Sequence, residues 1–340
     1  MPPFNRPLLV GACLLISLAT ATLAQEDPLQ ALRGDEVLAL VPLAGAARVE
    51  MPGGRNLRVP LPDRADLSAF AAIDGGWVAA GSVPDAAGGR KLILLRGNDK
   101  TATPLPEPPG QQDPRRQGAV LLVDGGRLAG IAWLEGNDDR SLAVRASLWN
   151  GKRWSAPERV SFPGPGSQLA LTGAVLSDGS WLLAWSAFDG EDDEIVWTRR
   201  QGNAWLPVER LTADSVPDIT PAVTATPDGG ALIAWSRFDG RGYQLRMARL
   251  AGNQWTDERP AAGSGSLYPA FLGGSRLLYL DAAPPRGWSV LDLDPQGRVK
   301  ARAKVTSALE RPVVDVEGGQ VRMRWPARNQ KATVALEKVP

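Results

Sequence analysis

Short apolar runs separated by tight turns fill most of this chain. Between residues 219 and 258 four such runs follow one another: Pro221–Thr226, Ala231–Arg237, Tyr243–Leu250 and a fourth around Trp255. Asp-Gly, Gly-Gly and Gly-Asn pairs lie between the runs, and such pairs favour the tight turns of antiparallel hairpins. The second run is apolar at consecutive positions, as expected for a strand that is covered on both faces. The pattern predicts four short antiparallel strands in about 40 residues.

The same unit occurs again fifty residues earlier. The tripeptide Ala-Trp-Ser at 184–186 recurs at 234–236, Trp205 recurs as Trp255, and a third copy covers 118–158. Weaker copies open at glycine pairs beginning at Gly75, Gly273 and Gly318. Repeats of this length, with four strands each, are typical of β-propellers. Six openings recur at spacings of 45–54 residues.

The repeat predicts an all-β fold in which residues 35–340 form a single β-propeller domain. We expect about six four-stranded antiparallel blades, or seven if residues 35–62 form a blade of their own. The last unit has room for three strands at most. We therefore expect the ring to be closed by N- and C-terminal strands, with 332–339 pairing in the same blade as strands from 36–61, because closure removes exposed strand edges.

Tryptophans occur at two fixed places in the repeat. The first set is Trp133, Trp185 and Trp235, and the second is Trp154, Trp205 and Trp255. Recurrence at fixed positions predicts packing between blades, and a sugar-stacking role is the less favoured alternative. Three other tryptophans lie outside this register and are candidates for exposed aromatic side chains: Trp77, Trp197 and Trp288.

The N-terminus has the pattern of a secretory signal peptide. Arg6 precedes an apolar stretch at Leu8–Leu18, and small residues end at Ala24. We expect cleavage after Ala24, export to the periplasm or beyond, and a flexible segment at 25–34. A lipid anchor on Cys13 is disfavoured because the apolar stretch continues beyond that residue. No later apolar run is long enough to span a membrane.

Charge and composition exclude several classes of function. Removing Arg6 with the signal peptide leaves 37 basic residues against 37 acidic ones, so nucleic-acid binding is disfavoured. The chain has no histidine, and its single cysteine lies in the signal peptide. Ser-His-Asp and Cys-His catalysis and histidine-bound zinc are therefore excluded. We expect a monomer with no cofactor and no bound metal.

Two acidic clusters lie in turns between the second and third strands of their units, at 135–139 and 189–194. Carboxylate oxygens crowded on a loop can bind calcium. Neither cluster has the spacing of an EF-hand loop, so solvated turns are the favoured interpretation and calcium sites the alternative.

A candidate ligand site lies where the innermost strands begin. Arg116, Tyr268 and Arg311 each directly precede or begin such a strand, at the mouth of the axial channel. Two guanidinium groups and a phenol around one funnel suit an anionic or sugar ligand. Surface arginines next to turn prolines are the alternative interpretation.

The hairpin at 147–154 resembles the Asp-box (BNR repeat) of the sialidase-like β-propellers. It keeps that motif's Ser, Gly and Trp at Ser147, Gly151 and Trp154 but lacks the Asp, so the repeat is degenerate. The resemblance covers about 118–260 well and implies the propeller fold. A catalytic member would also show an arginine triad and a Tyr–Glu nucleophile pair, and we find no matched set. The resemblance therefore implies a non-catalytic member.

The sequence favours an exported binding or scaffold propeller. We expect it to recognise a protein or carbohydrate partner in the cell envelope through its channel face, without catalysis. The alternative is a sialidase-like or other carboxylate-based glycoside hydrolase, because carboxylate pairs are among the catalytic groups that remain. A purely structural envelope protein is a third hypothesis.

Overall fold

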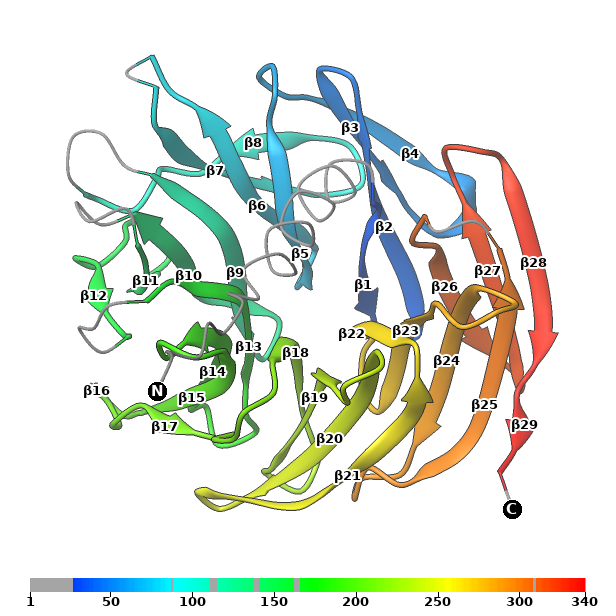
Figure 1. The fold of residues 1–340 in the computed structure, drawn as a ribbon. Helices are drawn as coiled ribbons and strands as arrows, with labels where there is room; N and C mark the ends of the chain where they lie inside the picture. The colour runs from blue at the N-terminus through cyan, green and yellow to red at the C-terminus, as the bar shows by residue number, and fades with distance from the viewer. Residues whose placement is uncertain are drawn as a thin grey trace, which may run out of the picture.

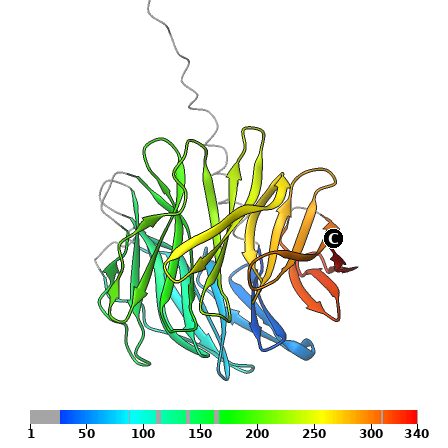
Figure 2. The ribbon, with the colours of Figure 1, turned by 90° about the horizontal axis from the view of Figure 1, so that it is seen from below.

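The described part of the chain folds into a ring of seven β-sheets around a central axis (Figure 1). The computed structural model describes residues 27–86, 88–110, 115–136, 141–161, 166–307 and 310–339. The signal peptide predicted at 1–24, with Cys13, lies outside them. Seen from the side, the sheets stand next to one another around the ring (Figure 2). The all-β propeller of four-stranded antiparallel blades predicted from the repeat is confirmed.

The first three blades follow one another along the chain. Blade 1 contains β1 (Leu29–Arg33), β2 (Glu36–Leu43), β3 (Ala46–Glu50), the 3-10 turn η1 (Pro52–Gly54) and β4 (Asn56–Pro60). Blade 2 contains β5 (Asp66–Ile73), β6 (Gly76–Pro84), β7 (Arg90–Gly97) and β8 (Ala102–Pro104). Blade 3 contains β9 (Arg116–Asp124), β10 (Arg127–Gly136), β11 (Leu142–Leu148) and β12 (Glu158–Arg159).

The remaining four blades complete the ring. Blade 4 contains β13 (Gln168–Val175), β14 (Trp181–Phe188), β15 (Asp193–Gln201), β16 (Ala204–Trp205) and β17 (Glu209–Arg210). Blade 5 contains β18 (Asp218–Ala225), β19 (Ala231–Phe238), β20 (Tyr243–Ala251) and β21 (Gln254–Ser264). Blade 6 contains β22 (Ser266–Phe271), β23 (Arg276–Asp281), β24 (Gly287–Leu293), β25 (Val299–Thr306) and β29 (Glu337–Lys338). Blade 7 contains β26 (Val313–Glu317), β27 (Gln320–Trp325) and β28 (Gln330–Ala335).

The two ends of the chain meet in neighbouring sheets and not in a shared one. The seventh blade is the one that we expected if residues 35–62 formed a blade of their own. The predicted pairing of 332–339 with strands from 36–61 is wrong: β28 pairs with β27, and β29 pairs with β25 of blade 6. The expected flexible segment at 25–34 is also wrong for Leu29–Arg33, because these residues pair with β2 as the innermost strand of blade 1.

Apolar side chains fill the space between six successive pairs of blades. Separate clusters join blades 1 and 2, 2 and 3, 3 and 4, 4 and 5, 5 and 6, and 6 and 7. The packing role predicted for the first tryptophan set is confirmed, since each of its members is fully buried. The expected exposure of the out-of-register tryptophans is wrong: Trp77, Trp197 and Trp288 are at most 4% exposed. The reason is that a blade between two others has no free face.

Helical structure is almost absent from the described ranges. None of the helices found there is long and apolar enough to cross a membrane.

Candidate functional site

The interface between blade 1 and blade 7, called the seam below, differs from the other six. In the part of the chain that the structure describes, no buried apolar cluster joins these two blades. The carboxamide of Gln30 instead bonds the backbone of Val314: its Nε2 donates to the carbonyl at 3.1 Å, and its Oε1 accepts from the amide at 2.9 Å. The Gln30 side chain thus pairs with the amide and the carbonyl of Val314 as the backbone of a neighbouring strand would. The amide of Arg311 adds a bond to Asp27 Oδ1 at 3.1 Å.

An ion cluster crosses the seam farther from the axis. Glu50 at the end of β3 accepts from Arg324 of β27 and pairs with Arg48, whose Nη2 lies 2.8 Å from Glu50 Oε1. Burial, together with the neighbouring Arg48, lowers the pKa of Arg324. One carboxylate therefore stands between two guanidinium groups, and polar contacts join the two blades beside a few buried apolar side chains such as Val41 and Ala46.

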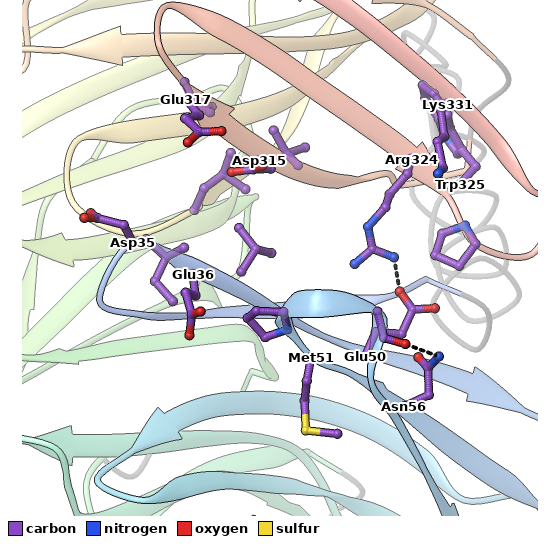
Figure 3. A pocket seen from close by; sticks show the side chains of 18 of the residues that line it. Asp35, Glu36, Glu50, Met51, Asn56, Asp315, Glu317, Arg324, Trp325 and Lys331 are labelled. Atoms are coloured by element: carbon purple, nitrogen blue, oxygen red, sulfur yellow. Dashed lines mark hydrogen bonds and ion pairs between the residues drawn. The ribbon is translucent and has the colours of Figure 1, made fainter. Parts of the chain in front are cut away.

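A hollow of about 800 Å³ opens on the seam (Figure 3). Four carboxylates gather toward one end of it, contributed by both terminal blades: Asp35, Glu36, Asp315 and Glu317. Arg324 and Lys331 lie toward the other end. The hollow, called the charged hollow below, therefore presents an acidic end and a basic end to whatever enters it.

A second hollow of about 920 Å³ opens on the same seam, with more apolar walls. Its lining includes Pro42, Leu43 and Leu61 of blade 1 together with Arg64 and Arg311. Arg48, Trp325 and Pro326 line both hollows. The two hollows thus adjoin at the ion cluster.

The predicted ligand residue Arg116 is already bound by protein groups. It begins β9 and is 2% exposed, and its guanidinium pairs with Glu107 and Glu135 at 2.9 Å each. It also donates to the carbonyl of Pro108 at 3.0 Å and lies over the ring of Trp133. These contacts give Arg116 a structural role.

Tyr268 and Arg311 lie in other blades. Tyr268 is the third residue of β22, at a bulge with φ 53°, and burial raises the pKa of its phenol. Arg311 lies just before β26 and lines the second hollow. Burial lowers the pKa of its guanidinium group. Of the three predicted residues, only Arg311 lines a hollow at the seam, and it lines the second one alone. Their joint action on one ligand stays a prediction.

The same left-handed bulge recurs where several innermost strands begin. The residues with positive φ at the third position of β9, β13, β18 and β22 are Gly118, Ala170, Thr220 and Tyr268. Thr220 is braced by two serines of the repeated Ala-Trp-Ser tripeptide: its amide donates to Ser186 Oγ at 3.2 Å, and its hydroxyl bonds Ser236 at 2.9 Å. A non-glycine residue in this conformation is held there by its surroundings. The recurrence at one repeat position marks it as part of the scaffold.

Sequence reasoning singled out Arg311 but missed the other seam residues, among them Gln30 and Glu50. Gln30 lies 284 residues from Val314, and Glu50 lies 274 residues from Arg324. No local pattern links positions so far apart. The available signal was the short last unit, which indicated that the ring ends there but not how it is joined.

The chain matches no protein-family model and no curated protein. Solved structures similar to it include an ulvan lyase of a polysaccharide lyase family, with a TM-score of 0.53 and 11% identity over 93% of this chain and 95% of that one. The lectin of Aleuria aurantia, described as a six-bladed propeller with fucose recognition, has a TM-score of 0.51 and 13% identity over 86% and 96%. A puromycin-hydrolyzing peptidase of Mycobacterium tuberculosis has a TM-score of 0.52 and 15% identity over 87% of this chain, which spans only 50% of that peptidase. At such identities the likeness shows the propeller fold alone.

Proposed function

We propose that this chain is an exported, non-catalytic propeller that binds an extended segment of a protein partner in the seam between blades 1 and 7. One observation carries the proposal: an apolar cluster joins the blades at six interfaces, whereas the described residues of the seventh form no such cluster and border two hollows. A ring that needed only stability would gain from an apolar cluster there too. The proposal keeps the class of function that the sequence favours and moves the binding surface from the channel face to the seam.

The walls of the hollows suit a peptide better than a sugar. Trp325 is the one aromatic residue among those that line the two hollows, and it is 5% exposed, with Nε1 donating to the carbonyl of Glu310 at 2.9 Å. Sugar recognition commonly uses an open aromatic face, which Trp325 does not offer. The charged hollow has an acidic and a basic end, and the walls of the second hollow are more apolar. This combination suits a polypeptide, which carries charged and apolar side chains together.

An open strand edge at the same blade also favours a protein partner. Blade 7 has three described strands where the other blades have at least four, and β28 is its outermost strand (Figure 1). After β28 the chain crosses to β25 of blade 6. The outer edge of β28 has no paired strand among the described residues, and such an edge offers backbone groups to an added strand.

Binding without catalysis is favoured by the ion pairs of the charged hollow. Glu50 is shared by two arginines, Glu36 pairs with Arg33, and Asp315 and Glu317 both pair with Arg322. These carboxylates are engaged by guanidinium groups of the protein itself, whereas glycoside hydrolysis needs one carboxyl group free to act as the acid and another to act as the base or nucleophile. A glycoside hydrolase is therefore the weaker hypothesis.

The proposed relationship to the sialidase-like propellers rests on the hairpin at 147–154. Trp149 occupies the place of that motif's Asp, and its ring packs against Trp154 with centroids 4.7 Å apart. Export is proposed on the signal-peptide pattern of residues 1–24.

A photo-crosslinking amino acid placed at the seam tests the proposed function. Glu317 lines the charged hollow and is exposed, and Asn203 in a turn of blade 4 is a control that is also exposed. We expect irradiation in intact cells to yield one protein adduct of defined mass from position 317 and none from 203. The same adduct from both positions, or none from 317, would contradict binding in the seam. Retention of a glycan on an array would instead favour a carbohydrate partner.

A further inference from the structure

A group of carboxylates lies in blade 4, away from the seam, where β14 turns into β15. One oxygen from each of Asp189, Asp192 and Glu194 lies within 4.8 Å of the others. Asp189 organises the turn, since its Oδ1 accepts from the amides of Glu191 at 3.0 Å and Asp192 at 3.4 Å. Its Oδ2 lies 2.8 Å from Nη1 of Arg210, and among the described residues no other ion pair with a cation reaches the group.

Two buried oxygens of this group have no partner. Glu194 is 1% exposed; its Oε1 accepts from the amide of Asp214 at 2.8 Å, but its Oε2 accepts no hydrogen bond. Asp192 Oδ1 is likewise buried and unpaired. Leaving a charged oxygen buried and unpaired costs free energy, so each such oxygen calls for a compensating cation or proton.

The next blade shows that the turn itself needs no such group. In blade 5, fifty residues later, Asp239 makes the same turn, its Oδ1 accepting from the amides of Arg241 and Gly242 at 2.9 Å each. The positions equivalent to Asp192 and Glu194 are occupied there by Gly242 and Gln244. The fold therefore forms this hairpin without the two carboxylates, and their presence in blade 4 has no structural explanation in the turn.

We propose that Asp189, Asp192 and Glu194 form a calcium site. Calcium binds carboxylate oxygens at about 2.3–2.6 Å, so two of its ligands lie at most about 5 Å apart, which accommodates the 4.8 Å limit of this group. Magnesium and zinc hold their oxygen ligands closer, at about 2.0–2.2 Å. The ion would bond the unpaired oxygens of Asp192 and Glu194 and leave Arg210 on the outer oxygen of Asp189.

The crowding of negative charge agrees with this assignment. Three carboxylates each contribute one oxygen within 4.8 Å of the others, and Arg210 pairs only with Asp189. The rival explanation for the same crowding is a proton shared within the group. Calcium titration separates the two, because a shared proton gives no calcium-dependent signal.

The test is calcium titration of the full chain without its signal peptide, after treatment with a chelator. We expect binding heat and a rise in melting temperature, with a Kd of about 10⁻⁴–10⁻³ M, the range of extracellular calcium modules. Glu194→Gln and Asp192→Asn should each weaken binding at least tenfold. Gln is the residue that blade 5 carries at the position of Glu194, so the fold accepts it. Asp239→Asn in blade 5 is the matched control and should bind as the wild type does.

Three outcomes would overturn the proposal. The first is the absence of heat and of any melting shift at calcium concentrations up to about 10 mM, well above the expected Kd. The second is equal calcium affinity of Glu194→Gln and the wild type. The third is equal binding of magnesium and calcium, because the site would then not select the larger ion. The crosslinking test at the seam is unaffected by any of them.

Discussion

The buried tryptophan N–H groups find different partners in successive blades, although the tryptophans themselves recur. The donor and acceptor pairs are Trp133 with Glu135, Trp185 with Gln168, and Trp235 with Asp218. In blades 4 and 5 the acceptor is the first residue of the innermost strand, and in blade 3 that place is taken by Arg116. The repeated position thus serves a structural purpose with side chains of different charge, which is why a charge at the channel mouth does not by itself indicate a ligand.

Replacing Arg116 with Ala tests its structural role. We expect the free energy of unfolding to fall by about 3 kcal/mol or more, because Glu107 and Glu135 lose a buried partner. Urea unfolding measures the change. Arg153→Ala, at an exposed turn of the same blade, should stay within about 0.5 kcal/mol of the wild type. An Arg116→Ala protein of normal stability would return this residue to the ligand hypothesis.

Asp218 predicts a pH dependence of stability. Burial raises its pKa from 3.8 to about 7, against the opposing effect of Arg237. Because the folded pKa is higher than the unfolded one, its contribution is fully present below about pH 4 and is lost as the pH rises to about 7. Asp218→Asn keeps an acceptor for Trp235 and removes the titration. As the pH rises from 5 to 8, the wild type should lose free energy of unfolding that the variant keeps. We therefore expect the stability of the variant relative to the wild type to be higher at pH 8 than at pH 5.

Urea unfolding of both proteins at the two pH values measures this difference. Asp239→Asn serves as the control, since hydrogen bonds to backbone amides lower the pKa of Asp239 and place its titration below the window. A difference between Asp218→Asn and the wild type that is constant with pH, or that changes in the opposite direction, would contradict the assignment.

Among the strands, the C-terminal pair have separate tasks. β28 completes blade 7, and its Ala332 and Val334 pack against the cluster between blades 6 and 7. β29 is exposed and makes a two-residue pairing with β25. Neither strand joins blade 1, so the C-terminus stabilises blades 6 and 7 and does not lock the ring through a shared sheet.

Two truncations separate these tasks. A chain that ends at Leu336 lacks β29 and should melt within about 2 °C of the full chain, because little apolar area is lost. A chain that ends at Asn329 also lacks β28 and should melt at least about 4 °C lower, because part of an apolar cluster is uncovered. Calorimetry measures both. If the truncation at Leu336 already lowered the melting temperature as much as the truncation at Asn329, β29 would be the strand that closes the fold.

The ring as a whole is least tightly sealed at the seam. The contacts between blade 1 and blade 7 include those of Gln30, Asp27 and the Glu50 ion cluster, whereas each of the other interfaces also has a buried apolar cluster. Interfaces with little apolar burial open at lower free energy than those with much. The place that a partner would enter is therefore also the place where the ring opens most readily.

Amide hydrogen exchange tests this difference around the ring. We expect the amides of β1 and β26 to exchange faster than those of β13 and β18, which are also innermost strands but lie between sealed blades. Gln30→Glu removes the donor to the Val314 carbonyl and should accelerate exchange at the seam alone. Uniform exchange around the ring, or an effect of Gln30→Glu that spreads to blade 4, would contradict a weak seam.

The strands, turns and buried faces of blades 3 to 5 were predictable from local patterns. Each blade is a meander whose neighbours in space are neighbours in sequence, so apolar runs, turn pairs and a fifty-residue repeat suffice to place Trp185 and Trp235 in the core. The exclusion of histidine-based catalysis was equally predictable, because a chain without histidine cannot use it in any fold.

The way the ring closes, its hollows and its buried charges depended on contacts between distant segments. Gln30 and Val314 meet because seven blades, not six, complete the circle, and nothing near either residue records that number. The same holds for Arg116, which is an ordinary arginine in the sequence and becomes a buried ion partner only when Glu107 and Glu135 fold around it. Periodicity reports which face of a strand is covered; which partner covers it is set by the long-range packing of the ring.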